Sequence, residues 1–466
     1  MILRFFHLYL KTMEPSTSKK IPTIPRLRML KSIFTFISNP IPILNQYIEE
    51  VGDTYYMYMG GQMKSIMTAN PHIIQHVLQK NHRNYRKSPI QVDQLAHYVG
   101  QGLLTSEGAY WLKQRRLIQP GFHRNKLAAL VDIMGREIDL FLDQMDQEVP
   151  DGQPFDMVHK MHELAFIVVA KSLFSTGVEK ELLNRLSDNI TQIQSFIVQE
   201  IRQPYLKAWF NLSGKKRRME QMGEDSKKII LQVIQQRRDS GQRQDDLLDM
   251  LLEARYEDTG EGMNDTQLLE ESLIIFIAGH ETSANALAWT WYILSQHPDV
   301  LLKVRKEIEE HLGKRKATAA DLPKLTYLTQ VIQESMRIYP PAWITDRVPN
   351  EDDEIEGYQI PKDVLIGVYI YGVHHSPKYW ENPSQFDPSR FEKDKIKSRP
   401  SYAYMPFGGG PRLCIGNNFA MMEMQLILIR MIQRYEIKLL DQPAIEMMPL
   451  VTLRPKNGIQ MNKTRK

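Results

Sequence analysis

The stretch that decides the fold is Phe407-Gly408-Gly409-Gly410-Pro411-Arg412-Leu413-Cys414-Ile415-Gly416, which holds the only cysteine of the chain. A lone cysteine is most often a small buried apolar residue. Here three glycines precede it, and glycine lets a backbone come close to a flat and bulky group. The apolar run from Phe419 to Met431 predicts a helix that begins just after the cysteine. The N-terminus of that helix, together with Arg412, favours a thiolate, which is a ligand for a soft metal or for haem iron.

The composition indicates one large globular fold. The 466 residues contain 42% hydrophobic and 24% charged residues, as globular proteins do, and neither a linker nor an internal repeat divides them. The net charge of +4 is too small to indicate a nucleic-acid partner, and a single cysteine suits a reducing cytoplasm. We expect an extended lead-in over residues 1–30 and a single domain over residues 31–466.

Two segments raise the question of membrane contact. The apolar stretch Met1–Leu10 is interrupted by Arg4 and His7 and is too short to span a bilayer, which needs about 20 apolar residues. It predicts a frayed end, with a weak interfacial anchor as the alternative. The segment 204–218 places aromatic residues beside a basic run and predicts a solvated loop, with a membrane-facing or entrance-lining segment as the alternative. We therefore expect membrane contact to be weak or absent.

The longest predicted helix begins near Asn264 or Asp265 and ends at His297. Its length of about 33 residues corresponds to roughly 50 Å, enough to cross a large domain. Its centre is very apolar, but Glu281 in that centre argues against a membrane span, because an uncompensated carboxylate in lipid is costly. The adjacent acid and alcohol, Glu281 and Thr282, are suited to controlled delivery of protons to a bound group.

Other elements and pairs are weaker signals. Two β-prone runs around Gly60-Gly61 predict a hairpin, and residues 364–371 and the region after Tyr435 predict short strands, with a basic tail from Met461 to Lys466. Glu334 and Arg337 lie on one face of a helix predicted over residues 325–338; a surface ion pair is the default, and a buried triad with Arg390 is the alternative.

Candidate groups for binding a buried carboxylate come from two places. Trp111 and Arg115 are four residues apart on one helical face, so an indole N–H and a guanidinium could donate together, although an arginine that lies along an aromatic ring is the simpler interpretation. Arg347 is an isolated base that means little by itself.

In combination these residues resemble the cytochrome P450 superfamily. The pattern F-x-x-G-x-R-x-C-x-G is met by Phe407, Gly410, Arg412, Cys414 and Gly416. The pattern [AG]-G-x-[DE]-T-[TS] is met by Ala278, Gly279, Glu281, Thr282 and Ser283. Glu334 and Arg337 match E-x-x-R, residues 386–391 match the aromatic–arginine element, and Trp111 and Arg115 match W-x-x-x-R. All five occur in family order over residues 111–416.

The resemblance implies a mainly α fold with small β-sheets and a haem b (iron protoporphyrin IX) between the long central helix and the helix after the cysteine loop. It implies that Cys414 is the axial thiolate ligand. Trp111, Arg115, Arg347 and Arg412 would hold the haem propionates, and Ala278, Phe407, Gly410 and Gly416 would contact the cofactor. Thr282 and Glu281 would be the catalytic pair on the distal face.

The implied function is that of a soluble, bacterial haem-thiolate monooxygenase of the cytoplasm that inserts one oxygen atom from O2 into an apolar substrate. About 50 residues follow Cys414, so we expect no fused reductase and a separate ferredoxin or flavodoxin-type donor with its own reductase. A basic docking patch is expected on the thiolate side, formed by Lys113, Arg116, Arg124 and Lys126. The expected walls of an apolar substrate pocket include Ile90, Leu95, Tyr98, Phe196, Ile197, Trp209 and Phe276.

Two other functions fit the same fold. One is a peroxide-using or hydroperoxide-rearranging enzyme, whose members often lack the acid–alcohol pair. The other is a haem protein that binds a small ligand without catalysis. Glu281 and Thr282 argue against both, because neither function needs controlled proton delivery.

Overall fold

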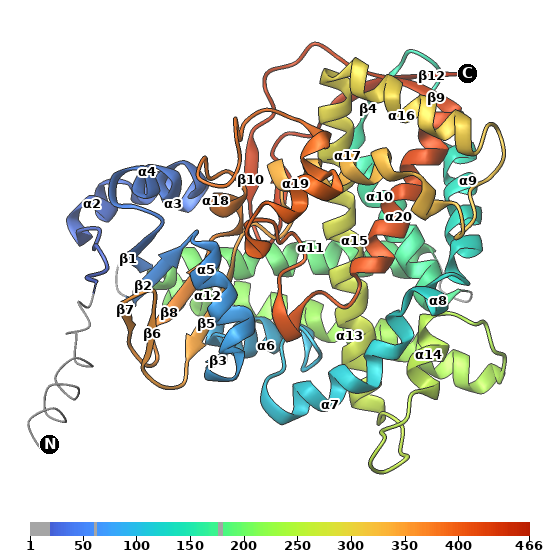
Figure 1. The fold of residues 1–466 in the computed structure, drawn as a ribbon. Helices are drawn as coiled ribbons and strands as arrows, with labels where there is room; N and C mark the ends of the chain where they lie inside the picture. Colours follow the sequence, from blue (N-terminus) through green and yellow to red (C-terminus); the bar gives the residue numbers. More distant parts are fainter. Residues whose placement is uncertain (1–18, 60–62, 176–179) are drawn as a thin grey trace, which may run out of the picture.

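Helix α15 (Asp265–Gln296) runs through the middle of the molecule, as Figure 1 shows. In this computed structural model, which describes residues 19–59, 63–175 and 180–466, α15 begins at a capping box between Asn264 and Gln267. It ends before Pro298, which starts α16 (Pro298–His311). The predicted long helix is thus confirmed to within one residue at its end, because both of its boundaries are set by local capping chemistry.

Long helices surround α15 and bury its apolar residues in the larger of two hydrophobic cores. They are α9 (Leu130–Glu148), α10 (Met157–Phe174), α11 (Lys180–Arg202), α13 (Lys215–Ser240), α17 (Thr326–Ile338) and α20 (Asn417–Arg434). Helix α20 is the one predicted to follow the cysteine. The other helices are α2 (Arg26–Lys31), α3 (Ile33–Ser38), α4 (Ile41–Val51), α5 (Pro71–Gln75), α6 (Ala96–Val99), α7 (Gly108–Ile118), α8 (Arg124–Leu127), α12 (Lys207–Leu212), α14 (Leu247–Glu253), α18 (Ile370–His374) and α19 (Lys393–Lys397).

A five-stranded sheet forms the second core, together with the N-terminal helices. Its order is β1-β2-β8-β5-β3, where β1 is Thr54–Met59, β2 is Met63–Thr68, β8 is Leu365–Val368, β5 is Thr345–Pro349 and β3 is Tyr85–Arg86. The strands of the expected hairpin pair antiparallel, with Met59 opposite Met63, and the turn between them lies outside the described residues. The sheet therefore joins segments about 300 residues apart in the chain.

The C-terminal region forms two further sheets. Strands β10 (Met447–Pro449) and β11 (Leu453–Pro455) pair with each other, and β12 (Gln460–Arg465) lies between β4 (Pro154–Asp156) and β9 (Tyr435–Leu439). The expectation of a basic tail over residues 461–466 is wrong, because this segment is a strand. Its Lys463 is buried and pairs with Asp146 at 2.9 Å, which neutralises a charge that looks solvated in sequence. Strands β6 (Asp353–Ile355) and β7 (Tyr358–Ile360) pair with each other and form a fourth sheet.

The N-terminal lead-in is ordered against the sheet from the first described residue. Lys19 and Thr23 form isolated bridges with Tyr358 and Tyr56, and Ile21 and Ile24 are buried. The apolar stretch Met1–Leu10 lies outside the described residues. Every helix in the described part of the chain is too short or too polar to cross a bilayer.

A buried ion-pair network joins α17 to the loop ahead of the cysteine. Glu334 accepts two bonds from Arg337, at 2.7 and 2.8 Å, and lies 3.3 Å from Arg390. Arg337 also donates to the carbonyl oxygens of His374, Pro383 and Gln385. The buried triad is confirmed, and it ties three segments to one helix.

Candidate functional site

The loop that presents Cys414 is shaped by two glycines with left-handed backbones, Gly408 at φ 74° and Gly410 at φ 65°. A Cβ atom on Gly410 would lie 1.8 Å from the carbonyl oxygen of Leu78, so only glycine fits this contact. The loop closes with a hydrogen bond from the Cys414 amide to the Phe407 carbonyl oxygen, at 2.9 Å. The sequence predicted that these glycines lie against a flat and bulky group. For Gly410 the structure shows instead that the close neighbour is the backbone carbonyl of Leu78.

The Cys414 side chain has accessible surface although protein surrounds it densely. The two observations agree if the thiol faces an open space inside the molecule rather than the outer surface. Burial raises the pKa of the Cys414 thiol, while the Gly416 amide and the Arg115 guanidinium lower it in part. Arg115, and not Arg412 as expected, is the charge that favours the thiolate.

Helix α15 has an accessible face at its centre, where its neighbouring positions are buried. Ala278 is exposed and Thr282, one turn further on, is half-buried. The Thr282 hydroxyl donates to the Ala278 carbonyl oxygen at 2.8 Å. The helix stays continuous through Gly279, where a Cβ atom would lie 3.2 Å from Val169 of α10, so this glycine serves close helix packing.

Glu281 points to a different neighbour from Thr282. Its carboxylate accepts a hydrogen bond from the Thr452 hydroxyl and one from Arg454 Nε at 2.8 Å, and both partners lie at the β10–β11 pair. Burial by itself would raise the pKa of Glu281, but Arg454 and Thr452 outweigh burial and lower it. Glu281 is therefore a buried carboxylate that is held by an ion pair with Arg454, about 170 residues later in the chain.

Several cations converge where the C-terminal end of the cysteine loop meets α7. Arg412 pairs with Glu107 and lies over the Trp111 ring, with its guanidinium carbon 5.3 Å from the ring centre. Arg347 is buried, and its Nη1 donates to the Asp346 carbonyl oxygen at 2.5 Å. Burial and the nearby Arg412 lower the pKa of Arg347 to about 10. The structure thus brings Arg412 close to both Trp111 and Arg347, and their binding of propionates stays a prediction.

Sequence reasoning missed two members of this cluster, Lys87 and Glu107. The buried Lys87 ammonium donates to the carbonyl oxygens of Leu103 and Ser106, and burial lowers its pKa to about 7. The Lys87 amide donates to Glu107 at 2.8 Å. Neither residue belongs to a short motif, so only the fold could identify them.

The apolar wall residues are brought together only in part. Leu95, Tyr98 and Ile197 line a cavity of only about 10 Å³ against α15. The expectation for Trp209 is wrong, because it lies 63% exposed on α12. Phe276 packs against α10 instead, with its ring centre 5.1 Å from that of Phe166. Both misassignments arise from helix rotation, which composition does not specify.

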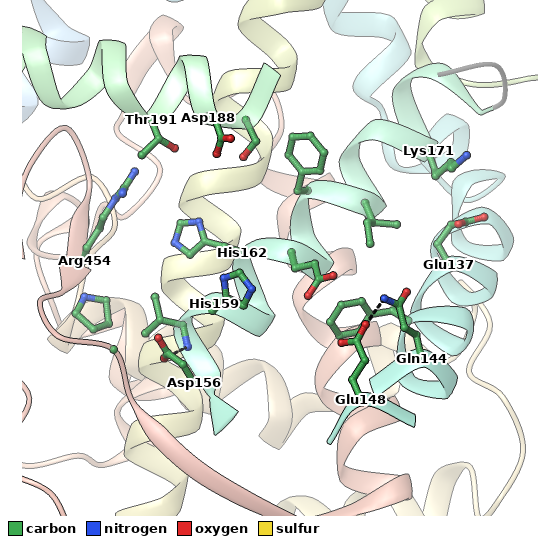
Figure 2. Close-up of a pocket in the computed structure, with 18 of the residues that line it drawn as sticks. Glu137, Gln144, Glu148, Asp156, His159, His162, Lys171, Asp188, Thr191 and Arg454 are labelled. Carbon is green, nitrogen blue, oxygen red and sulfur yellow. Dashed lines mark hydrogen bonds between the residues drawn. The ribbon is translucent and has the colours of Figure 1, made fainter. Parts of the chain in front are cut away.

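A larger, polar cavity of about 960 Å³ lies between α9, α10, α11 and the β10–β11 pair (Figure 2). His159, His162 and Arg454 are on its wall. His162 lies 3.1 Å from Asn285 of α15, and Arg454 holds Glu281, so two residues that line the cavity contact α15. Within the described ranges no group of three or more acidic, histidine or cysteine side chains is arranged to hold a metal ion.

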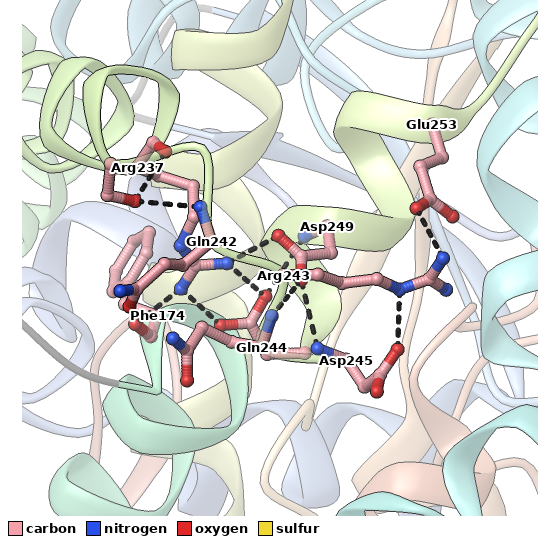
Figure 3. Close-up of polar contacts among 10 residues, drawn as sticks. Phe174, Arg237, Gln242, Arg243, Gln244, Asp245, Asp249 and Glu253 are labelled. Atoms are coloured by element: carbon pink, nitrogen blue, oxygen red, sulfur yellow. Dashed lines mark hydrogen bonds and ion pairs between the residues drawn. The ribbon is translucent and has the colours of Figure 1, made fainter.

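A second buried polar cluster is structural (Figure 3). Arg237 of α13 pairs with Asp246 and Asp249 and donates to the Phe174 carbonyl oxygen at 2.9 Å. The Arg237 contacts join the ends of α10, α13 and α14, and Asp249 also accepts from the amides of Gln244 and Asp245, so the cluster fixes these helices and the loop before α14.

The donor set fits a haem with a thiolate ligand. Cys414 offers an accessible sulfur in a dense environment, as a thiolate bound to iron requires. Arg412 Nη1 is buried without a hydrogen-bond partner among the described residues, and Arg347 has a backbone carbonyl as its partner. Arg412 pairs with Glu107 through Nη2 only, so its free Nη1 and the Arg347 guanidinium remain to match the two propionates of a haem.

Glu423 of α20 predicts an unusual pH dependence of stability. It is fully buried, its oxygens make no standard hydrogen bond within the described residues, and burial raises its pKa to about 8. The folded state holds this proton more tightly than the unfolded state, so stability falls as pH rises from about 4.5 to about 8. At about 1.4 kcal/mol per pKa unit, Glu423 should lower the free energy of unfolding by several kcal/mol between pH 5 and pH 8. Glu423→Gln should remove this loss, which urea unfolding at the two pH values measures.

The exposed Glu309→Gln on α16 is the matched control and should leave the pH dependence unchanged. A Glu423→Gln variant with the parent's pH dependence would show that Glu423 is ionised in the folded protein.

The chain is similar to known proteins over nearly its whole length. A family model described as "Cytochrome P450" matches residues 22–462. A cyclooctat-9-en-7-ol 5-monooxygenase of Streptomyces melanosporofaciens is 31% identical over 378 residues, which is 81% of each chain. Cytochrome P450 4A2 of Rattus norvegicus is 29% identical and covers 89% of this chain and 84% of its own. The crystal structure of the cytochrome P450DA heme domain superposes with a TM-score of 0.84 at 22% identity, covering 96% of this chain and 98% of the other.

Proposed function

The chain belongs to the cytochrome P450 family, and from this premise we propose that it is a haem-thiolate monooxygenase that inserts one oxygen atom from O2 into an apolar organic substrate. The cofactor in this proposal is haem b, and the electrons come from a separate redox protein. The observation that carries the proposal is the accessible Cys414 sulfur beside Arg115, with the buried cations Arg347 and Arg412 close to Trp111.

Each part of the cluster has a distinct role toward the cofactor. Cys414 would bind the haem iron, and Arg115 would stabilise the negative charge of the thiolate. Trp111, Arg115, Arg347 and Arg412 would hold the propionates, and Lys87 would add positive charge to the same region. When bound, the haem binds and activates O2. Phe407, Gly410 and Gly416 shape the loop that contacts it, and Ala278 leaves room on α15.

Thr282 and Glu281 supply the protons in this proposal. Thr282 is half-buried, and its hydroxyl has a fixed orientation because it donates to the Ala278 carbonyl oxygen. Glu281 is charged, so it must take up a proton before it can pass one on. Arg454, which holds Glu281, also lines the polar cavity, so we infer that protons reach Glu281 from that side of α15.

The substrate and the electron donor are inferred from the walls they would touch. A bacterial relative is named for oxidation of cyclooctat-9-en-7-ol, so we infer a hydrocarbon-rich substrate. Lys113, Arg116, Arg124 and Lys126 are exposed on α7 and α8 and suit an acidic ferredoxin or flavodoxin. Lys113 Nζ lies 3.6 Å from Asp258 Oδ2, and this ion pair weakens the contribution of Lys113 to the basic patch. A single free cysteine suits a reducing compartment, so the proposal includes a reaction in the cytoplasm.

The function is tested by reconstitution with a ferredoxin and its reductase. A substrate is first selected by its shift of the haem spin state. The proposal expects NADPH consumption that depends on both the donor and the substrate, and one ¹⁸O atom from ¹⁸O₂ in the product. Turnover with hydrogen peroxide alone, or spin-state shifts without any turnover, would replace it with one of the two other functions.

Thr282→Ala should separate electron consumption from product formation. The variant keeps Cys414 and the haem cations, so its spectrum and NADPH consumption should stay close to the parent's. Without the hydroxyl, product per NADPH should fall about tenfold or more, and hydrogen peroxide should account for the difference.

Thr290→Ala is the matched control, since Thr290 makes the same contact to the carbonyl oxygen four residues earlier, at 2.7 Å, but in the core. Full coupling in Thr282→Ala would remove Thr282 from proton delivery.

A further inference from the structure

His374 is a buried histidine outside every sequence motif of the site, and it lies between the buried ion-pair network and the cysteine loop. It is the last residue of α18 and is fully buried. Its backbone carbonyl oxygen accepts from Arg337 Nη1 at 2.9 Å, so the network of Glu334 holds the backbone of this residue in place. The bonds of its imidazole ring decide whether His374 only fills the core or also acts on the site.

The imidazole ring of His374 accepts a hydrogen bond from the segment that leads into the cysteine loop. The Met405 amide donates to His374 Nε2 at 2.9 Å, and both residues are buried. A neutral imidazole accepts at one nitrogen and carries its proton on the other, so this bond assigns the proton to Nδ1. The backbone carbonyl groups of Met336 and Arg337, near the end of α17, lie close to the ring. The ring therefore lies between the end of α17 and the Met405 amide.

Met405 is in turn connected to the backbone of the cysteine loop. Its carbonyl oxygen accepts from the Gly408 amide at 3.0 Å, and Gly408 has a left-handed backbone with φ 74°. The neighbouring Phe407 carbonyl oxygen accepts from the Cys414 amide at 2.9 Å. A short run of backbone, with a hydrogen bond at each end, thus joins the ring of His374 to the amide of Cys414.

Packing and charge keep the acceptor nitrogen directed at Met405. Tyr404 stacks on the His374 ring, with 5.3 Å between the ring centres and 24° between the planes. The Tyr404 hydroxyl donates to the Gln333 carbonyl oxygen of α17 at 2.9 Å. Burial, together with His375 and Arg337, holds the pKa of the His374 imidazole well below its ordinary value. The ring thus stays neutral, and Nε2 keeps the lone pair that a protonated ring would lose.

We propose that His374 is a positioning residue for the thiolate ligand, an inference that rests on the proposed haem-thiolate function. It acts through the Met405 amide, and the residues of the loop, not His374, would contact the cofactor. An apolar side chain could fill the same volume, but it would leave the buried Met405 amide without a partner. The surroundings of a metal ligand orient it and tune its strength, so a loop that is free to shift should lose its thiolate more readily.

His374→Phe and His374→Gln separate the acceptor from the volume of the ring. Phenylalanine keeps a flat ring beside Tyr404 but has no acceptor, whereas glutamine ends in an amide oxygen near the position of Nε2. In the haem-loaded protein, the reduced carbon monoxide complex of His374→Phe should lose its thiolate-type spectrum about tenfold faster than the parent or more. The reduction potential of its haem iron should shift to a more positive value, because less charge reaches the iron. His374→Gln should stay close to the parent in both measurements.

Tyr435→Phe is the matched control for a general loss of stability. Tyr435 is also fully buried, and its hydroxyl donates to the Leu142 carbonyl oxygen at 3.0 Å, on the β9 sheet rather than beside the cysteine loop. This variant should lower the midpoint of urea unfolding and leave the rate of spectral loss unchanged. If His374→Phe does not load haem, His374→Asn replaces it, because its shorter amide ends near the position of Nδ1 and does not reach Met405.

Three outcomes would overturn the proposal. They are spectral loss in His374→Phe or His374→Asn at the parent's rate, equal acceleration in His374→Gln and His374→Phe, and acceleration in Tyr435→Phe that matches theirs. The second would show that ring volume matters rather than the acceptor, and the third that stability alone does. A parent protein with the thiolate-type spectrum but without oxygenated product would instead refute the proposed monooxygenase function, and the effect of His374 on the spectrum would stand.

Discussion

Replacing Cys414 by serine is expected to abolish the thiolate-type absorption spectrum of the reduced carbon monoxide complex and monooxygenase turnover with it. Cys414 is the only cysteine in the chain. A serine hydroxyl neither ionises as readily as a thiol nor donates charge to iron as a thiolate does. The substitution removes one sulfur and adds one oxygen at an accessible position, so the fold should persist.

Two measurements make this prediction specific. Reaction of the unfolded apoprotein with a thiol reagent should fall from one equivalent to none in Cys414→Ser. Thr282→Ala should retain the parent's carbon monoxide spectrum, because it leaves the proximal loop unchanged. A thiolate-type spectrum in Cys414→Ser would refute the assignment of the ligand.

Breaking the ion pair between Glu334 and Arg337 should have the largest effect on stability. Both side chains are fully buried, and Arg337 donates to three carbonyl oxygens of residues 374–385 besides Glu334. Glu334→Ala leaves a buried cation without its partner, which should cost about 3–5 kcal/mol of unfolding free energy. Arg337→Lys should also be destabilising, because an ammonium cannot reproduce the forked guanidinium contacts.

Urea unfolding of the haem-loaded protein measures the effect. The exposed pair Lys306 and Glu310 on α16 is the control, and Glu310→Ala should change stability by less than about 1 kcal/mol. If Glu334→Ala does not accumulate as folded protein, Glu334→Gln keeps the volume and should still lower the urea midpoint. A loss no larger than the control's would show that the buried network contributes little.

Local chemistry accounts for the parts of the fold that were predictable. The boundaries of α15 follow from a capping box and a proline, and α20 follows from an apolar run after the cysteine loop. The strands of the hairpin were predictable because β-prone residues flank two glycines. The strand β12 was missed because its basic residues look solvated, and only the fold shows that Asp146 neutralises Lys463.

The sequence by itself identified the family and predicted the ligand Cys414 and the pair Glu281 and Thr282, because each is encoded in spacing along one loop or one helix. For Glu334 and Arg337 it favoured a surface ion pair and offered the buried triad with Arg390 only as the alternative. Only the tertiary structure decided which charges act on them. Arg115 rather than Arg412 lies near the thiol, and Arg454 holds Glu281 from a strand about 170 residues away. Lys87 and Glu107 joined the cation cluster. The physical reason is that charge and burial act through space, and the distances between remote segments are fixed by packing rather than by spacing along the chain.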